Sequence, residues 1–290
     1  MFNVRLAETR SGGTANEDVV GHIGKAAWVI DGASGVGENL VSPISDAQWF
    51  AQSTDRELRK LLADQPDMRF EDLFLAVVER CAAAFAAEAR RPPAGRHEMP
   101  SAAIAFVRAL SDRVEMATLG DCEILYRQAD GDAVAQHGDG GNVGAFEALT
   151  KASVRDLVAA NPAISSEALF EAMRPQLVRN RAHMNVDGGY WVLGLQPEAV
   201  AHADRIELPH GELELALASD GFLRLSDMFD RIARADMLAI ERREDFDNWY
   251  GQLRDLEQAP GSLASHPRAK MSDDASFVRI DLHTNSVPKG

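Results

Sequence analysis

The stretch Trp28-Val29-Ile30-Asp31-Gly32-Ala33-Ser34-Gly35 joins an apolar run to an aspartate and then to a series of small residues. The residues from Ala26 to Asp31 predict a buried strand that pairs with a strand from Asp18 to Ile23. Because a glycine-rich run does not readily continue a sheet, we expect the strand to end at Asp31. A carboxylate at the end of a strand is held by a rigid scaffold and can still face a cleft.

Three other aspartates stand beside predicted strands in the same way. They are Asp121 after Thr118-Leu119-Gly120, Asp220 after Leu217-Ala218-Ser219, and Asp273 just before Ala275. Hard divalent cations prefer oxygen ligands, so carboxylates that converge from several strand ends would form a site for them. The alternative is that each Asp-Gly pair is only a turn, and for any single pair this is the better explanation. Their repetition, together with Asn16-Glu17-Asp18, favours a shared metal site.

Strands and helices alternate in blocks along the rest of the chain. Ser45, with Gln48 three residues later, resembles a capping box at the start of a helix. The other predicted helices are 70–85, 145–160, 166–181 and 235–256. The predicted strands are 2–8, 18–23, 26–31, 101–109, 114–119, 123–127, 133–137, 190–193, 205–208, 213–218 and 275–282, with a turn at 130–131 and a loop at 138–144. Several strand pairs are close enough in sequence to be antiparallel hairpins, which favours an α+β sandwich over a parallel doubly wound sheet.

The composition of the chain limits which binding partners and which cellular location we expect. The chain has 290 residues, of which 46% are hydrophobic and 26% charged, a balance typical of globular proteins. A net charge of -15 argues against nucleic acid as a partner, because the phosphate backbone would be repelled. Two cysteines make neither a disulfide framework nor a zinc cluster. The N-terminus lacks the pattern of a signal peptide and no apolar run is long enough to span a membrane, so we expect a cytoplasmic protein without membrane contact.

Four blocks of the sequence resemble, in order, the type 2C (PPM) family of metal-dependent protein serine/threonine phosphatases in its bacterial form. The blocks are 16–18 with 28–35, 118–123, 217–222 and 273–278. The resemblance implies a four-layer α-β-β-α sandwich, with two antiparallel sheets and a metal site between them. It also implies one phosphatase domain over 1–290 with a variable flap at about 137–189, and we expect the tail at 283–290 to be loose because it follows the last predicted strand.

The same resemblance implies a ligand set for two Mn²⁺ or Mg²⁺ ions per chain. Asp31 would bridge the two ions, and the carbonyl of Gly32 would bind one of them. Asp220 and Asp273 would hold the other ion. Asp273, rather than Asp274, matches the family ligand because Ser276 falls three residues after it.

Glu17 and Asp18 would act in the reaction mainly through metal-bound water. The implied reaction is hydrolysis of phosphoserine or phosphothreonine in proteins, by in-line attack of a water that bridges the metals. Two cations about 3.5–4 Å apart would lower the pKa of that water and neutralise the phosphoryl oxygens. The implied partner is therefore a phosphorylated protein.

The sequence departs from the family at three positions. Gly13 stands where members often carry a phosphate-binding arginine, and Arg10, three residues earlier, is the nearest replacement. Ala33 stands where some members have a histidine proposed as a general acid. A third metal would use Asp121 and an acidic residue at position 224, but Arg224 stands there, so we expect that ion to bind weakly or not at all.

Other functions remain open from the sequence. A catalytically weak phosphatase-fold protein that binds a phosphorylated partner, or a phosphatase of small phosphometabolites, would carry the same carboxylates. A nucleotide loop at 32–37 does not follow the dinucleotide fingerprint. A serine hydrolase acting through Ser34 lacks the last glycine of the nucleophile elbow.

Overall fold

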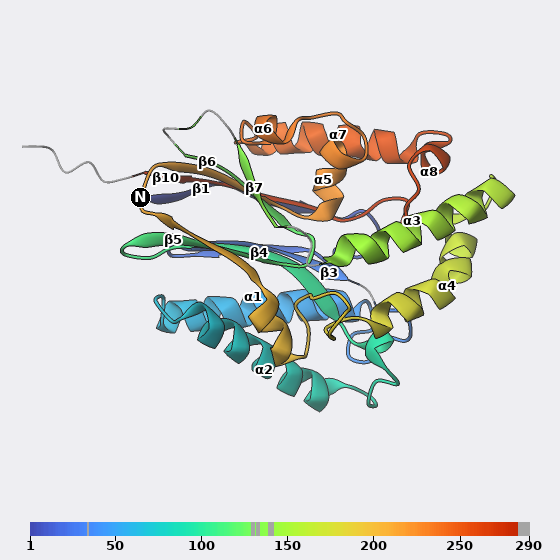
Figure 1. Ribbon diagram of the computed structural model, residues 1–290, viewed down its shortest axis with the longest axis horizontal. Helices are drawn as coiled ribbons and strands as arrows, with labels where there is room; N and C mark the ends of the chain where they lie inside the picture. The colour runs from blue at the N-terminus through green and yellow to red at the C-terminus, as the bar shows by residue number, and fades with distance from the viewer. Residues whose placement is uncertain (34, 129–130, 132–133, 139–141, 284–290) are drawn as a thin grey trace, which may run out of the picture.

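Two antiparallel sheets of five strands pack face to face in the computed structural model, which describes residues 1–33, 35–128, 131, 134–138 and 142–283 (Figure 1). The first sheet has the order β1-β10-β9-β6-β7 and the second β2-β3-β4-β5-β8. The strands are β1 (Phe2–Arg10), β2 (Val19–Ile23), β3 (Ala26–Ala33), β4 (Ser101–Ala109), β5 (Arg113–Leu119), β6 (Glu123–Gln128), β7 (Ala135–His137), β8 (Asp204–Pro209), β9 (Leu213–Ala218) and β10 (Ala275–Leu282).

Helices cover the outer face of each sheet and complete the four layers. Figure 1 shows α1 and α2 below the second sheet, α5, α6 and α7 above the first, and the pair α3 and α4 at one end. The helices are α1 (Asp46–Asp64), α2 (Phe70–Glu88), α3 (Val143–Ala160), α4 (Ser166–Ala182), α5 (Asp220–Asp227), α6 (Arg234–Met237), α7 (Arg243–Gln258) and α8 (Ser262–Ser265), with 3-10 turns η1 (Arg96–Glu98) and η3 (Pro197–His202). The predicted α+β sandwich is confirmed.

Strand β3 shows why its sequence is apolar at almost every position. Trp28 and Ile30 pack towards α1 and α2, whereas Ala27 and Val29 pack into the core between the sheets. Successive side chains of a strand point to opposite faces, so a strand with both faces covered has no polar face to show. The third apolar core lies between the first sheet and α5 and α7.

The prediction that β3 ends at Asp31 is wrong. Asp31, Gly32 and Ala33 continue the ladder and pair with β4. Gly32 serves here as a site of close approach, because a Cβ on it would lie 2.4 Å from the carbonyl oxygen of Glu17. Glycine in a strand interior often marks such an approach of a second backbone.

Two other predictions need correction. Residues 190–193 form only isolated bridges, Ala102 with Leu193 and Met184 with Tyr190, and not a strand. The helix predicted over 235–256 is two helices, α6 and α7. The chain leaves α6 to bury Leu238 and Ile240 in the upper core, and the carbonyl of Leu238 accepts a hydrogen bond from Arg279 Nε at 2.7 Å.

The remaining predictions agree with the structure to within a few residues or fall partly outside it. Helix α3 begins at Val143, inside the predicted loop of 138–144. Residue 130 of the predicted turn, residue 133 of a predicted strand, residues 139–141 of the predicted flap and the tail from 284 onwards lie outside the described residues. No helix in the described ranges is long and apolar enough to cross a membrane.

Candidate active site

The predicted acidic residues come from separate segments that meet at one end of the sandwich. Asp31 lies in β3, Asp220 begins α5, and Asp273 lies in the loop before β10. The charges of Asp18, Asp220, Asp121 and Asp273 all act on the carboxyl of Asp31. The fold therefore brings together carboxylates that the sequence spreads over more than 250 positions.

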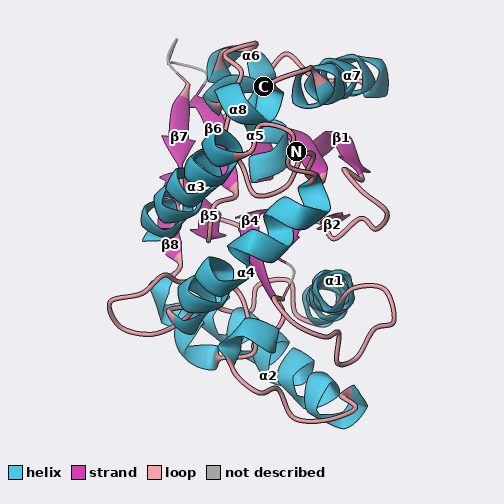
Figure 2. Ribbon diagram, turned by 90° about the vertical axis from the view of Figure 1, so that its right-hand side faces the viewer, coloured by secondary structure: helices cyan, strands magenta, loops and turns pink. Residues whose placement is uncertain are grey.

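Close contacts between backbones bring the segments together. Besides the approach of Gly32 to Glu17, a Cβ on Gly221 would lie 1.9 Å from the carbonyl oxygen of Asp274. The start of α5 and the loop before β10 can therefore touch only because residue 221 has no side chain. Figure 2 shows α5 behind α3 at this end of the molecule.

Burial and mutual repulsion disfavour ionisation of four of these carboxyls. Burial, followed by the charge of Asp18, raises the pKa of Asp31 well above its ordinary value. Burial raises the pKa of Asp18 to about 8, with added repulsion from Asp274 and Asp273. Burial and the charge of Asp220 raise the pKa of Asp121 to about 7. The pKa of Asp220 is raised by burial and by the charge of Asp273.

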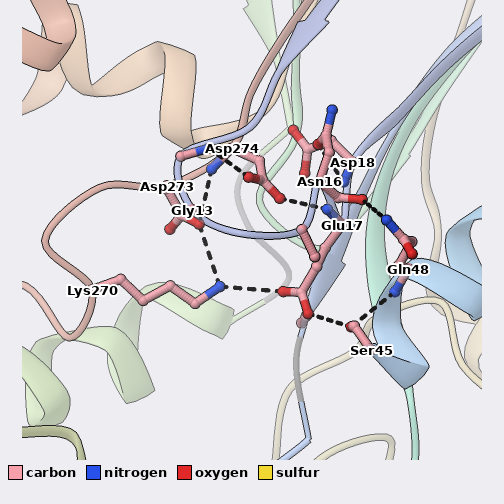
Figure 3. Close-up of polar contacts among 12 residues, drawn as sticks. Gly13, Asn16, Glu17, Asp18, Ser45, Gln48, Lys270, Asp273 and Asp274 are labelled. Carbon is pink, nitrogen blue, oxygen red and sulfur yellow. Dashed lines mark hydrogen bonds and ion pairs between the residues drawn. The ribbon is translucent and has the colours of Figure 1, made fainter. Parts of the chain in front are cut away.

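Asp273 differs because two cationic side chains meet it. Arg224 Nη2 donates to Asp273 Oδ2 at 2.6 Å, and Lys270 Nζ lies 3.4 Å from Asp273 Oδ1. Burial opposes ionisation of Asp273, but Lys270 and Arg224 outweigh it and lower the pKa of its carboxyl. Lys270 Nζ also lies 3.4 Å from Glu17 Oε2, so the ammonium joins two segments of the site (Figure 3).

Asp274 organises the loop that carries Glu17 and Asp18, a role that the sequence comparison did not assign. Its Oδ1 accepts hydrogen bonds from the Gly12 amide at 2.7 Å and from Ser11 Oγ at 3.2 Å. Its Oδ2 accepts from the Glu17 amide at 2.6 Å (Figure 3). The only sequence signal for this role is the position of Asp274 beside a predicted ligand.

Ser45 connects the first helix to the site. Its hydroxyl caps α1 by accepting from the Gln48 amide at 3.2 Å, as predicted, and also donates to Glu17 Oε1. The second half of the capping box is absent, because the Gln48 side chain instead donates to the Asn16 carbonyl at 2.8 Å. The start of α1 therefore supports the loop before β2.

The donor set suits hard divalent cations. The clustered side-chain donors are carboxylate oxygens, which Mn²⁺ and Mg²⁺ accept as ligands. In the described part of the chain, no three histidine, cysteine or acidic side chains are already arranged around one point. The donor chemistry of the site therefore fits cations, and the one predicted carboxylate ligand that forms ion pairs within the described residues is Asp273, with Arg224 and Lys270.

Arg10, the predicted phosphate ligand, is engaged elsewhere. Its Nη1 lies 2.7 Å from Glu8 Oε2, its Nη2 lies 2.9 Å from Asp247 Oδ1, and its guanidinium packs over the ring of Phe246. Gly13 is exposed, and a Cβ placed on it would meet nothing within 4 Å. The roles assigned to Arg10, Glu17, Asp18, Asp31 and the other site residues stay predictions.

A cleft of 630 Å³ opens beside the carboxylates, between α3, α5 and the loop before β10. Asp121, Asp220 and Asp273 line its inner end, together with Arg224 and Lys270. Helix α3, from the predicted variable segment, contributes Glu147, Thr150 and Lys151 to the opposite wall. Ser34, the nucleophile of the hydrolase alternative, lies outside the described residues.

Solved structures share this architecture. The chain resembles the Mycobacterium tuberculosis serine/threonine phosphatase PstP/Ppp with a TM-score of 0.56 and 16% identity, over 98% of this chain and 99% of that one. A PstP catalytic domain in complex with two manganese ions gives a TM-score of 0.57 and 15% identity, over 98% and 99%. The PPM Ser-Thr phosphatase MsPP from Mycobacterium smegmatis, in complex with cacodylate, gives 0.52 and 18%, over 96% and 97%. No protein-family model and no curated protein sequence matches the chain. The likeness shows the fold of the PPM phosphatases.

Proposed function

We propose that this chain, which has the PPM phosphatase fold, is a Mn²⁺- or Mg²⁺-dependent phosphatase that hydrolyses phosphoserine and phosphothreonine in proteins. The observation that carries the proposal is that Asp121, Asp220 and Asp273 line one cleft and that the charges of all three act on the carboxyl of Asp31. We also propose that the chain forms one domain, whose flap is the segment around α3 and α4, and that it acts in the cytoplasm.

The residues that would hold two cations are those of the predicted set. Asp31 and the Gly32 carbonyl would meet one ion, and Asp31, Asp220 and Asp273 the other. When bound, the cations would supply an activated water and neutralise charge on the phosphoryl group. The carboxylates of Glu17 and Asp18 would orient water, because both are buried next to this cluster.

Hydrolysis joins a water oxygen to phosphorus and breaks the bond from phosphorus to the serine or threonine oxygen, which takes up a proton. The chain's own contribution is placement. Asp274 holds the backbone of Gly12 and Glu17, and Ser45 holds the Glu17 carboxylate. These contacts fix the loop of Glu17 and Asp18 against the cleft before any substrate arrives.

Turnover of p-nitrophenyl phosphate with and without Mn²⁺ tests the proposal. We expect Mn²⁺ or Mg²⁺ to activate the full-length protein and a chelator to abolish activity. Full turnover after exhaustive chelation would contradict metal dependence. Absence of turnover with retained binding of a phosphopeptide would favour the binding-protein alternative, and faster turnover of phosphometabolites than of phosphopeptides would favour the metabolite phosphatase.

A further inference from the structure

A phosphate monoester carries two negative charges and must enter a cleft whose inner end is lined with carboxylates. Bound cations would offset part of that repulsion. A protein cation at the mouth of the cluster would attract the outer phosphoryl oxygens, as charge-assisted hydrogen bonds do in other phosphate sites. The lysines and arginines that line the cleft are Lys151, Arg224, Arg268 and Lys270.

Three of these four side chains are buried or held in closer ion pairs than Lys270. Arg224 is buried, with Nη1 2.8 Å from Glu257 and Nη2 2.6 Å from Asp273. Arg268 is also buried, and it donates to the backbone carbonyls of Glu257, Ser262, His266 and Met271. Lys151 forms an ion pair of 2.7 Å with Glu147 on the surface of α3.

Lys270 alone among them combines proximity to the carboxylates with access to solvent. Its side chain is 41% exposed, and its ammonium lies between Glu17 and Asp273 (Figure 3). Both contacts measure 3.4 Å, longer than the roughly 2.7–2.9 Å typical of charge-assisted hydrogen bonds. An ammonium has three donors on a flexible stem, so it can turn towards an anion without a change in the backbone.

We propose that Lys270 binds the phosphoryl group of the substrate from the solvent side of the carboxylate cluster. The assignment rests on the proposed phosphatase function. It places a positive charge at the cleft where Gly13 supplies none and where Arg10 is paired with Glu8 and Asp247.

The test compares Lys270→Met with Lys270→Arg and with Lys151→Met, a matched loss of one lysine from the same cleft. Two quantities are measured at saturating Mn²⁺: KM and kcat for p-nitrophenyl phosphate, and the Kd of inorganic phosphate by calorimetry. Loss of a charged hydrogen bond corresponds to an increase of about tenfold to a hundredfold in Kd. We expect that increase in both KM and phosphate Kd for Lys270→Met, a nearly unchanged kcat, recovery in Lys270→Arg and no effect in Lys151→Met.

Two results would overturn the assignment. The first is an unchanged phosphate Kd in Lys270→Met with tighter Mn²⁺ binding, which would make Lys270 only a counter-charge for Glu17 and Asp273. The second is an equal loss in Lys151→Met, which would indicate a general effect of charge. If the wild type binds phosphate without turnover, the proposed function fails, and the phosphate Kd values still decide the role of Lys270.

Discussion

Replacing Asp274 tests whether the loop of Glu17 is held by one carboxylate. The side chain is 7% exposed and accepts from the amides of Gly12 and Glu17 and from the hydroxyl of Ser11. Alanine would leave two backbone N–H groups without that partner, at about 1–3 kcal/mol each. We therefore expect Asp274→Ala to lower the free energy of unfolding by about 2–6 kcal/mol, a large share of the total for a typical protein.

Asparagine separates the loss of charge from the loss of an acceptor. Asp274→Asn keeps one oxygen for either Gly12 or Glu17 and presents an NH₂ group to the other amide, so its cost should be about half that of alanine. Urea unfolding by linear extrapolation measures both values. Asp255→Ala, at an exposed position of α7, is the control and should change stability by less than about 0.5 kcal/mol. A loss below about 1 kcal/mol in Asp274→Ala would refute the view that this carboxylate holds the loop.

Three further predictions concern the site itself. Asp273→Asn should lose far more activity than Asp274→Asn at a temperature where both are folded, because only Asp273 is expected to hold metal; equal losses would show that the last strand has been aligned wrongly. Arg224 should keep Asp121 from holding a third ion, since a cation beside a cation costs binding energy. Calorimetry should therefore count two Mn²⁺ ions in the wild type and three in the double variant Arg224→Asp, Glu257→Gln. The second substitution removes the charge of Glu257, which would otherwise be left buried without Arg224. A tightly bound third ion in the wild type would contradict this prediction. Gly13→Arg should lower KM for simple phosphate esters by about tenfold, since residue 13 has room for a side chain and no positive φ; Arg10→Ala should leave KM unchanged, and a tenfold rise there would show that Arg10 binds phosphate.

The features that could be predicted from the sequence are those that short sequence motifs specify. Strand β10 follows the predicted bounds, because its residues alternate between two buried faces and it begins directly after the acidic pair 273–274. The aspartates could be located for a related reason, since each stands beside an apolar run, although the strand can continue past the aspartate, as β3 does. The order of four such blocks then indicated the fold.

Contacts between distant segments were beyond sequence reasoning. Arg224 forms ion pairs with Asp273 and Glu257, which lie 49 and 33 positions away in the sequence. No local sequence pattern around these residues predicts the two contacts. The sequence suggested Arg224 only as the replacement of an acidic residue. The extension of β3 through Gly32 was missed for a related reason: glycine weakens a strand locally, whereas here its benefit is the approach of Glu17 from another segment.

Positive charge is distributed unevenly among the carboxylates of the site. Within the described residues, lysine and arginine form ion pairs with Asp273, while Asp31, Asp121 and Asp220 form none. A buried carboxylate is costly unless it is protonated, is paired or holds a metal, so bound cations would relieve that cost at Asp31 and Asp220. The paired part, around Asp273 and Lys270, already carries positive charge and faces the cleft. If Lys270 binds the phosphoryl group, the phosphate should enter on the side of the cleft next to Lys270, beside the cation that Asp273 would hold.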